Sequence, residues 1–196
     1  MSTLSNIVDN SLKQYGHLIY NANQKLNLVS RKINLQDINN LIKEALLPSS
    51  WDVCNLASPI LDIGTGAGLP GLPIKMANTA TSITLLDSNR RKCNFLKTAI
   101  SILNLSNVIV VCERAEVFAN ESDNITKYQT IVSRGVGKLG QMLDWADKML
   151  KSDGELILWK GESVKAELAE IDQSIWEEPQ YLSCSSQLVL VRIVRK

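Results

Sequence analysis

The chain has 196 residues, 45% of them hydrophobic and 21% charged, which suits one compact domain and leaves no room for a second full one. The formal net charge of +1 excludes a protein that holds nucleic acid through general electrostatic attraction alone. Four cysteines without a C-x-x-C pair, and a single histidine, argue against a structural zinc site or a disulfide framework. No apolar run approaches the roughly 20 residues that cross a bilayer, and no signal pattern opens the chain. We therefore expect a single cytoplasmic domain over residues 1–196, without a metal or a membrane partner.

The first part of the chain predicts a helical cap. From Leu4 to Leu26, apolar residues recur every three or four positions, which is the spacing of an amphipathic helix. A second helix is expected over Leu35–Leu47, ending near Pro48 because proline cannot continue a helix. The two helices form a cap over residues 1–57, ahead of a core over residues 58–196.

The core predicts an α/β fold, because short β-rich runs alternate with longer helical runs. The expected strands are Ile60–Ile63, Ser82–Asp87, Val108–Val111, Thr130–Ser133 and Glu155–Trp159. The expected helices are Leu69–Ala77, Asn89–Asn104, Ala115–Asn120, Lys138–Leu150 and Glu162–Trp176. Two final β runs, Gln180–Ser183 and Gln187–Val194, predict an antiparallel hairpin at one edge. The result is a doubly wound, Rossmann-like sheet, mostly parallel, with an antiparallel C-terminal edge.

The most informative segment runs from Ile60 to Gly71, where an apolar strand is followed by an acid, Asp62, and then by four glycines. Gly64, Gly66 and Gly68 lack a Cβ, so the chain can turn sharply and its amides can approach a ligand closely. Each glycine weakens a helix start by roughly 1 kcal/mol relative to alanine. A bound nucleotide cofactor explains three of them better than a purely structural turn does.

Two cofactors are compatible with this loop. Residues Gly66–Gly71 fit the dinucleotide pattern G-x-G-x-x-G, with Asp87 at the end of the next strand to accept ribose hydroxyls. However, Pro70 and Pro73 each remove an amide that a pyrophosphate needs, and Asp62 adds a negative charge nearby. S-adenosylmethionine has no phosphate, carries two cationic groups that Asp62 favours, and still offers ribose hydroxyls. The residues favour this cofactor, with a NAD-dependent oxidoreductase as the alternative.

Further candidate residues follow the later strands of the predicted sheet. Ala115 and Glu116 come after the third strand, Arg134 ends the fourth, and Lys160 ends the fifth. Because ligands of open α/β sheets bind beyond the carboxyl ends of the strands, we expect these residues on one rim with the glycine loop. Basic residues at 90–92 lie near the same rim and suit either a solvated helix start or a surface facing RNA.

Five motifs together resemble one protein family. They are Asn27-Leu-Val-Ser30, Leu61-Asp-Ile-Gly-Thr-Gly-Ala-Gly-Leu-Pro-Gly-Leu-Pro73, Leu85-Leu-Asp-Ser88, Ile131-Val-Ser-Arg-Gly135 and Trp159-Lys-Gly161. With them the chain resembles the bacterial small-subunit ribosomal RNA guanine-N7 methyltransferase G family, historically called glucose-inhibited division protein B, over about residues 10–195. The continuation of the loop into Leu-Pro-Gly-Leu-Pro is the most distinctive motif, because most methyltransferases lack these prolines.

The resemblance implies transfer of a methyl group from S-adenosylmethionine to N7 of a guanine in 16S rRNA. The family's cofactor contacts carry over to Gly64, Leu69, Ala115, Glu116 and Arg134. Asp87 matches the family's ribose-binding acid, and Lys160 matches a basic position near RNA or the transferred group. Guanine N7 already carries a lone pair, so the reaction needs no general base. We therefore assign no catalytic base and expect Arg134 and Lys160 to act in positioning.

One family motif differs in this chain. Where the family typically has His-x-x-Asp-Ser in the second helix, the matching stretch is Lys43–Pro48, with Glu44 in place of histidine and Leu47 in place of aspartate. The change motivates a third hypothesis, a non-catalytic relative that binds RNA or the ribosome. We expect a monomer whose partner is 16S rRNA or the small subunit, and the near-neutral charge favours a structured particle over free RNA.

Overall fold

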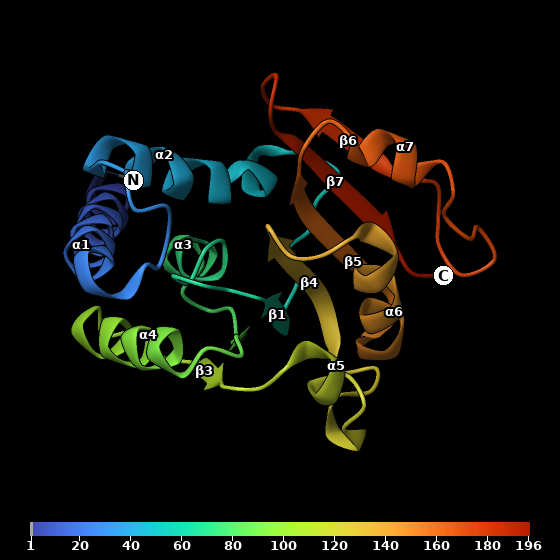
Figure 1. The fold of residues 1–196 in the computed structure, drawn as a ribbon, viewed down its shortest axis with the longest axis horizontal. Coiled ribbons are helices and arrows are strands. Elements are labelled where there is room, and N and C mark those ends of the chain that lie inside the picture. The colour runs from blue at the N-terminus through green and yellow to red at the C-terminus, as the bar shows by residue number, and fades with distance from the viewer. Residues whose placement is uncertain (1) are drawn as a thin grey trace.

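The computed structural model describes residues 2–196, with side chains from residue 8 onward (Figure 1). The cap consists of α1 (Ser2–Leu26), α2 (Leu35–Ala45) and a 3-10 turn, η1 (Leu47–Ser50). Leu4, the first residue of the apolar pattern in the predicted helix, has a side chain outside the described part. A capping box begins α2, because the Asn34 side chain accepts from the Asp37 amide while the Asp37 carboxylate accepts from the Asn34 amide. The helix ends two residues earlier than predicted.

Seven strands form one sheet in the order β3-β2-β1-β4-β5-β7-β6. They are β1 (Ile60–Ile63), β2 (Ile83–Leu86), β3 (Val108–Val111), β4 (Tyr128–Arg134), β5 (Leu150–Lys160), β6 (Gln180–Ser183) and β7 (Val189–Val194). The first five are parallel, and β7 runs antiparallel to both β5 and β6. The predicted mostly parallel sheet with an antiparallel C-terminal edge is confirmed. The strand order reverses between β1 and β4, which places a ligand crevice beside the glycine loop.

Helices cover both faces of this sheet (Figure 1). The connections contain α3 (Gly71–Ala77), α4 (Arg90–Ile102), α5 (Ala115–Phe118), the 3-10 turn η2 (Ser122–Asn124), α6 (Leu139–Met149) and α7 (Val164–Leu168). Side chains alternate between the faces, so Ile60 joins a core with α1 to α4, whereas Leu61 joins a second core with α5 to α7. The cap therefore shares its core with one face of the sheet.

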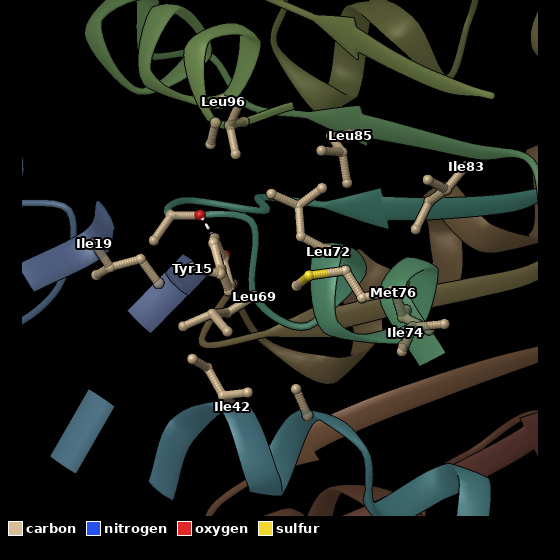
Figure 2. Close-up of a cluster of buried hydrophobic side chains, with 14 of the residues drawn as sticks. Tyr15, Ile19, Ile42, Leu69, Leu72, Ile74, Met76, Ile83, Leu85 and Leu96 are labelled. Atoms are coloured by element: carbon tan, nitrogen blue, oxygen red, sulfur yellow. Dashed lines mark hydrogen bonds between the residues drawn. The ribbon is translucent and has the colours of Figure 1, made fainter. Parts of the chain in front are cut away.

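Figure 2 shows how the cap reaches the glycine loop. Tyr15 and Ile19 of α1 and Ile42 of α2 are buried in the same hydrophobic cluster as Leu72 of α3. The Tyr15 hydroxyl donates a hydrogen bond of 2.7 Å to the Ala67 carbonyl within the loop. The pKa of Tyr15 is well above its usual range, chiefly because of burial, so this hydroxyl remains a donor. The cap thus contacts the predicted cofactor loop directly.

The segment after β5 differs most from the sequence prediction. A helix was expected over Glu162–Trp176, but α7 covers only Val164–Leu168. The Ser174 amide donates to the Asp172 carboxylate at 2.8 Å, which satisfies the backbone locally and competes with a helix. Trp176 then pairs with Arg195 in an isolated β-bridge, so the chain turns back to the sheet. Elsewhere the differences are in boundaries: α3 begins at Gly71 rather than Leu69, and β5 runs over Leu150–Lys160 rather than Glu155–Trp159.

A buried carboxylate ties the linker after the cap to the sheet. Glu155 is 4% exposed, and its Oε1 accepts from the amides of Asn55 at 3.0 Å and Leu56 at 2.7 Å. Its Oε2 accepts from Arg192 Nε at 2.8 Å. Within residues 2–196 no helix is long and apolar enough to cross a membrane. The described side chains also contain no group of three or more potential metal ligands.

Candidate active site

A cavity of about 650 Å³ lies at the carboxyl ends of β1, β2 and β4. The predicted residues on its wall are Gly64, Gly66, Leu69, Asp87, Ala115, Glu116 and Arg134. The structure therefore brings together seven of the site residues predicted from sequence, whereas Asp62, Gly68 and Lys160 do not line this cavity. The cap adds Leu28, Val29 and Leu41, which sequence reasoning did not assign to the site. The only sequence signal for them was the Asn27-Leu-Val-Ser30 motif, which contains Leu28 and Val29.

The loop glycines meet different requirements. Gly66 has φ +60°, and a Cβ there would lie 3.8 Å from the Gly64 carbonyl and 3.9 Å from Lys92 Nζ, with no closer neighbour. A side chain at residue 66 would therefore project into open space beside the cavity. A Cβ at Gly64, with φ +67°, would lie 2.2 Å from Val136 Cγ2, so that position needs glycine for contact with the segment after β4.

Gly68 serves packing within the protein. Its φ is +96°, and a Cβ there would lie 2.7 Å from Leu72 Cδ1, 2.8 Å from the Tyr15 hydroxyl and 2.9 Å from Leu96 Cδ2. Tyr15 belongs to α1, Leu96 to α4 and Leu72 to α3. Gly68 therefore lets the loop pack against α1 and α4.

Asp87 joins the end of β2 to the glycine loop. Its Oδ2 accepts from the Gly66 amide at 2.9 Å, and its Oδ1 accepts from the Asn89 amide at 2.8 Å. Asn89 in turn caps α4, because its side chain accepts from the Arg91 and Lys92 amides. Each carboxylate oxygen of Asp87 retains a lone pair, so the residue can still accept hydroxyl groups from a ligand in the cavity.

Asp62 lies behind the loop and is completely buried. Its Oδ2 accepts from Thr65 Oγ1 at 2.6 Å and from the Gly71 amide at 2.8 Å, so it holds both ends of the loop. Its Oδ1 is buried and has no hydrogen-bond partner. Burial raises the pKa of Asp62 to about 7, although the hydrogen bonds from Thr65 and Gly71 act in the opposite direction. The direct approach to a cofactor suggested by the sequence is not found, since the carboxylate does not reach the cavity wall.

Arg134 lines the cavity and pairs with the cap. Its Nη2 lies 2.5 Å from Glu44 Oε2 on α2, whereas its Nη1 is buried without a partner. The main-chain carbonyl of Glu44 also accepts from Trp159 Nε1 at 2.8 Å. Sequence comparison marked Glu44 only as a departure from a family pattern. The structure places it in contact with a predicted site residue.

Lys160 supports the segment that follows Arg134. Its Nζ donates to the carbonyls of Val136 at 3.2 Å and Gly137 at 2.7 Å. Burial lowers the pKa of Lys160. The amine is therefore engaged in holding residues 135–137 beside Gly64, and does not face the cavity as the sequence suggested. At the mouth, Glu116 pairs with Arg114 at 2.8 Å, with both side chains exposed.

Comparison with known proteins identifies the family of this chain. The family model described as rRNA small subunit methyltransferase G matches residues 8–187. Ribosomal RNA small subunit methyltransferase G of a type A Clostridium botulinum strain is 35% identical over 166 residues, covering 85% of this chain and 70% of the relative. The protein of the same name from Chlorobaculum tepidum is 35% identical over 159 residues, covering 81% of this chain and 71% of the relative.

Solved structures share the fold. TYW2 from M. jannaschii, solved in complex with AdoMet, has a TM-score of 0.58 at 14% sequence identity and covers 79% of this chain and 74% of its own. At that identity the likeness concerns the fold alone. The family model covers most of the chain, and the relatives exceed 30% identity over most of their length. The chain therefore belongs to the rRNA small subunit methyltransferase G family.

Proposed function

We propose that the protein transfers the methyl group of S-adenosylmethionine to N7 of a guanine in 16S rRNA of the small ribosomal subunit. The observation that carries this proposal is the junction of Gly66 and Asp87 at the wall of a 650 Å³ cavity, in a chain of this family. A glycine without a side chain and a carboxylate with free lone pairs stand side by side at the strand ends, where a nucleoside would bind.

The residues around the cavity fit S-adenosylmethionine. Gly66 leaves the space that a Cβ would fill, and Asp87 supplies acceptors for ribose hydroxyls. Arg134 Nη1 is a buried donor without a partner, which suits an oxygen of the bound molecules. A dinucleotide fits less well, because Pro70 and Pro73 remove amides at the short helix α3 and no pyrophosphate site is formed there. When bound, S-adenosylmethionine supplies a methyl group activated by a sulfonium.

The protein's contribution to this reaction is alignment. Guanine N7 presents its lone pair without losing a proton, so the cavity needs no general base. Holding two reactants in line is worth roughly 7 to 11 kcal/mol in well-oriented reactions. Methylation leaves positive charge on the purine, so the guanidinium of Arg134 serves an oxygen acceptor and does not lie against N7. The cap residues Leu28, Val29 and Leu41 contribute an apolar part of the cavity wall, which can contact the acceptor base.

The partner is the 16S rRNA, which places the protein in the cytoplasm with the ribosome. Because the net charge is only +1, we propose that recognition depends on the shape of a structured particle more than on attraction to any RNA. We further propose that a monomer suffices, because residues of the cap and the core of one chain together line the cavity.

Cofactor choice is tested by tryptophan fluorescence. Trp145 lines the cavity, so a ligand bound there should change its emission. Titration with S-adenosylhomocysteine should give a saturable change that a Trp145→Phe variant loses, and Asp87→Asn should weaken the affinity by about 10-fold. NAD should give no saturable change. Binding of NAD alone would instead support the oxidoreductase.

The acceptor is tested with labelled S-adenosylmethionine and ribosomal particles that lack the modification. Purified protein should incorporate label into 16S rRNA, and the rate should be higher with 30S subunits than with naked 16S rRNA. If cofactor binds but no RNA substrate is labelled, the protein is a non-catalytic relative, the reading that Glu44 and Leu47 first suggested. Faster transfer to naked RNA would contradict recognition of the particle.

A further inference from the structure

We propose that Glu44 is a positioning residue that acts through Arg134. Its carboxylate fixes the guanidinium so that the remaining amino group, Nη1, is held for an anionic oxygen in the cavity. That oxygen belongs either to the carboxylate of the bound cofactor or to a phosphate of the RNA. The inference rests on the proposed function, because it assumes that this cavity binds both molecules.

Glu44 is held at two points. Its side chain meets Arg134 at the end of β4, with 2.5 Å between Oε2 and Nη2. Its main-chain carbonyl accepts from Trp159 Nε1 at 2.8 Å, and Trp159, in the neighbouring strand β5, is only 2% exposed. Because the backbone of α2 is tied at this residue, the carboxylate has a defined place above the strand ends. The Glu44 carboxylate can therefore set the position of the Arg134 guanidinium, because its own position does not depend on Arg134.

The contact with Glu44 restrains the orientation of the Arg134 guanidinium. The guanidinium is planar, so a contact at Nη2 also sets the direction of Nη1. The Arg134 side chain is 22% exposed, but its Nη1 atom is buried without a partner. Buried donors are nearly always paired, so a free one on a residue that lines a cavity calls for a partner supplied by the bound molecules. A positively charged donor pairs most strongly with an anionic oxygen.

The ion pair of Asp147 and Arg195 provides a matched control. Their side chains are 39% and 22% exposed, against 35% and 22% for Glu44 and Arg134, and they lie 2.9 Å apart. Asp147 does not line the cofactor cavity. Removing either carboxylate should therefore lower the stability of the protein by a similar amount. Only removal of the Glu44 carboxylate should change binding or activity at the cavity.

The experiment compares Glu44→Gln, Glu44→Ala and Asp147→Asn in the full chain. We expect kcat/KM to fall about 10-fold in Glu44→Ala and by less in Glu44→Gln, whose amide oxygen still accepts from Nη2. Asp147→Asn should keep the wild-type kcat/KM, and the melting temperatures of all three variants should be similar. If the oxygen is the cofactor carboxylate, the Kd for S-adenosylhomocysteine rises; if it is an RNA phosphate, the KM for 30S subunits rises and that Kd does not change.

A double substitution tests whether Glu44 acts through Arg134. In an Arg134→Met background, which removes the charged partner of Glu44, Glu44→Ala should produce no further loss of kcat/KM and no further change in Kd. An equal loss of kcat/KM from Glu44→Ala with and without Arg134 would overturn the proposal. Glu44 variants that lower only the melting temperature, the effect expected of Asp147→Asn, would overturn it too. A wild-type protein that neither binds the cofactor nor methylates RNA would instead refute the proposed function. An active wild type with unaffected Glu44 variants would refute this inference alone.

Discussion

Replacing Tyr15 by phenylalanine removes one oxygen atom at the contact between the cap and the glycine loop. The hydroxyl donates a hydrogen bond of 2.7 Å, drawn in Figure 2, to the Ala67 carbonyl. Tyr15 is 0% exposed, and Ala67 is 2% exposed and lines the cavity. The aromatic ring and its packing remain in the variant. The change therefore isolates the hydrogen bond between two segments 52 residues apart in sequence.

The variant should lose stability and cofactor affinity together. A net hydrogen bond is worth about 1 kcal/mol, and a buried carbonyl left without a donor raises the cost toward about 2 kcal/mol. For a chain of this size that loss corresponds to a decrease in Tm of roughly 2 to 8 °C. Because the same bond holds the loop, the Kd for S-adenosylhomocysteine should rise by up to about fivefold. Calorimetry gives the first quantity and fluorescence titration the second.

Tyr128→Phe is the control for this prediction. Tyr128 is 1% exposed, but its hydroxyl lies 3.4 Å from Thr84 Oγ1 and the residue does not line the cavity. We expect a smaller loss of stability and an unchanged Kd. A Tyr15→Phe variant with wild-type Kd and Tm would show that the cap does not restrain the loop through this bond.

Three further predictions concern buried and loop positions. Gly66→Ala should weaken binding of S-adenosylhomocysteine by at least about 10-fold, with a loss of stability near 1 kcal/mol. Gly68→Ala, whose Cβ would overlap Leu72, should instead cost about 1 to 3 kcal/mol in urea unfolding. Equal effects of the two variants on affinity and on stability would contradict these separate roles. Folding raises the pKa of Asp62 from 3.8 to about 7, so between these pH values the folded chain binds one more proton than the unfolded chain. The free energy of unfolding therefore falls as pH rises, by at most about 1.4 kcal/mol per pH unit. Urea titrations should show that Asp62→Asn loses this pH dependence, and an unchanged slope in the variant would refute the prediction. Glu155→Ala leaves Arg192 Nε and the amides of Asn55 and Leu56 without their acceptor, so it should cost about 3 kcal/mol in urea unfolding. A loss below about 1 kcal/mol would exclude the role of Glu155 in holding the linker.

The sheet and much of its rim were predictable because their signals are local. Each parallel strand contains a short apolar run, and the residues that follow β1, β2 and β4 lie at one edge because the carboxyl ends of parallel strands point the same way. Asp87 and Arg134 therefore reach the cavity as expected from their place in sequence. Boundaries were less accurate, and the predicted helix over Glu162–Trp176 is wrong beyond Leu168, because pairing of Trp176 with Arg195 depends on a strand that comes later in the chain.

Contacts between distant segments could not be read from the sequence. Gly66 and Gly68 occupy equivalent places in one motif, yet only Gly68 packs against Tyr15, a residue of the cap. The Asp62 carboxyl group lies in the protein interior, where Thr65 and Gly71 donate hydrogen bonds to it. Glu44 and Arg134 are 90 residues apart, so their pairing follows from where α2 lies on the sheet. Burial and partnership of this kind come from tertiary packing, which no local pattern encodes.

The most direct test of the proposed activity is to map the methyl group itself. Small subunits lacking the modification are incubated with the protein and labelled S-adenosylmethionine, and the 16S rRNA is then analysed for the labelled nucleotide and its position. We predict that label accumulates as N7-methylguanine at one site, and that Gly66→Ala slows this accumulation when the cofactor is subsaturating. Label at another atom or another base, or no label from a protein that binds the cofactor, would contradict the account.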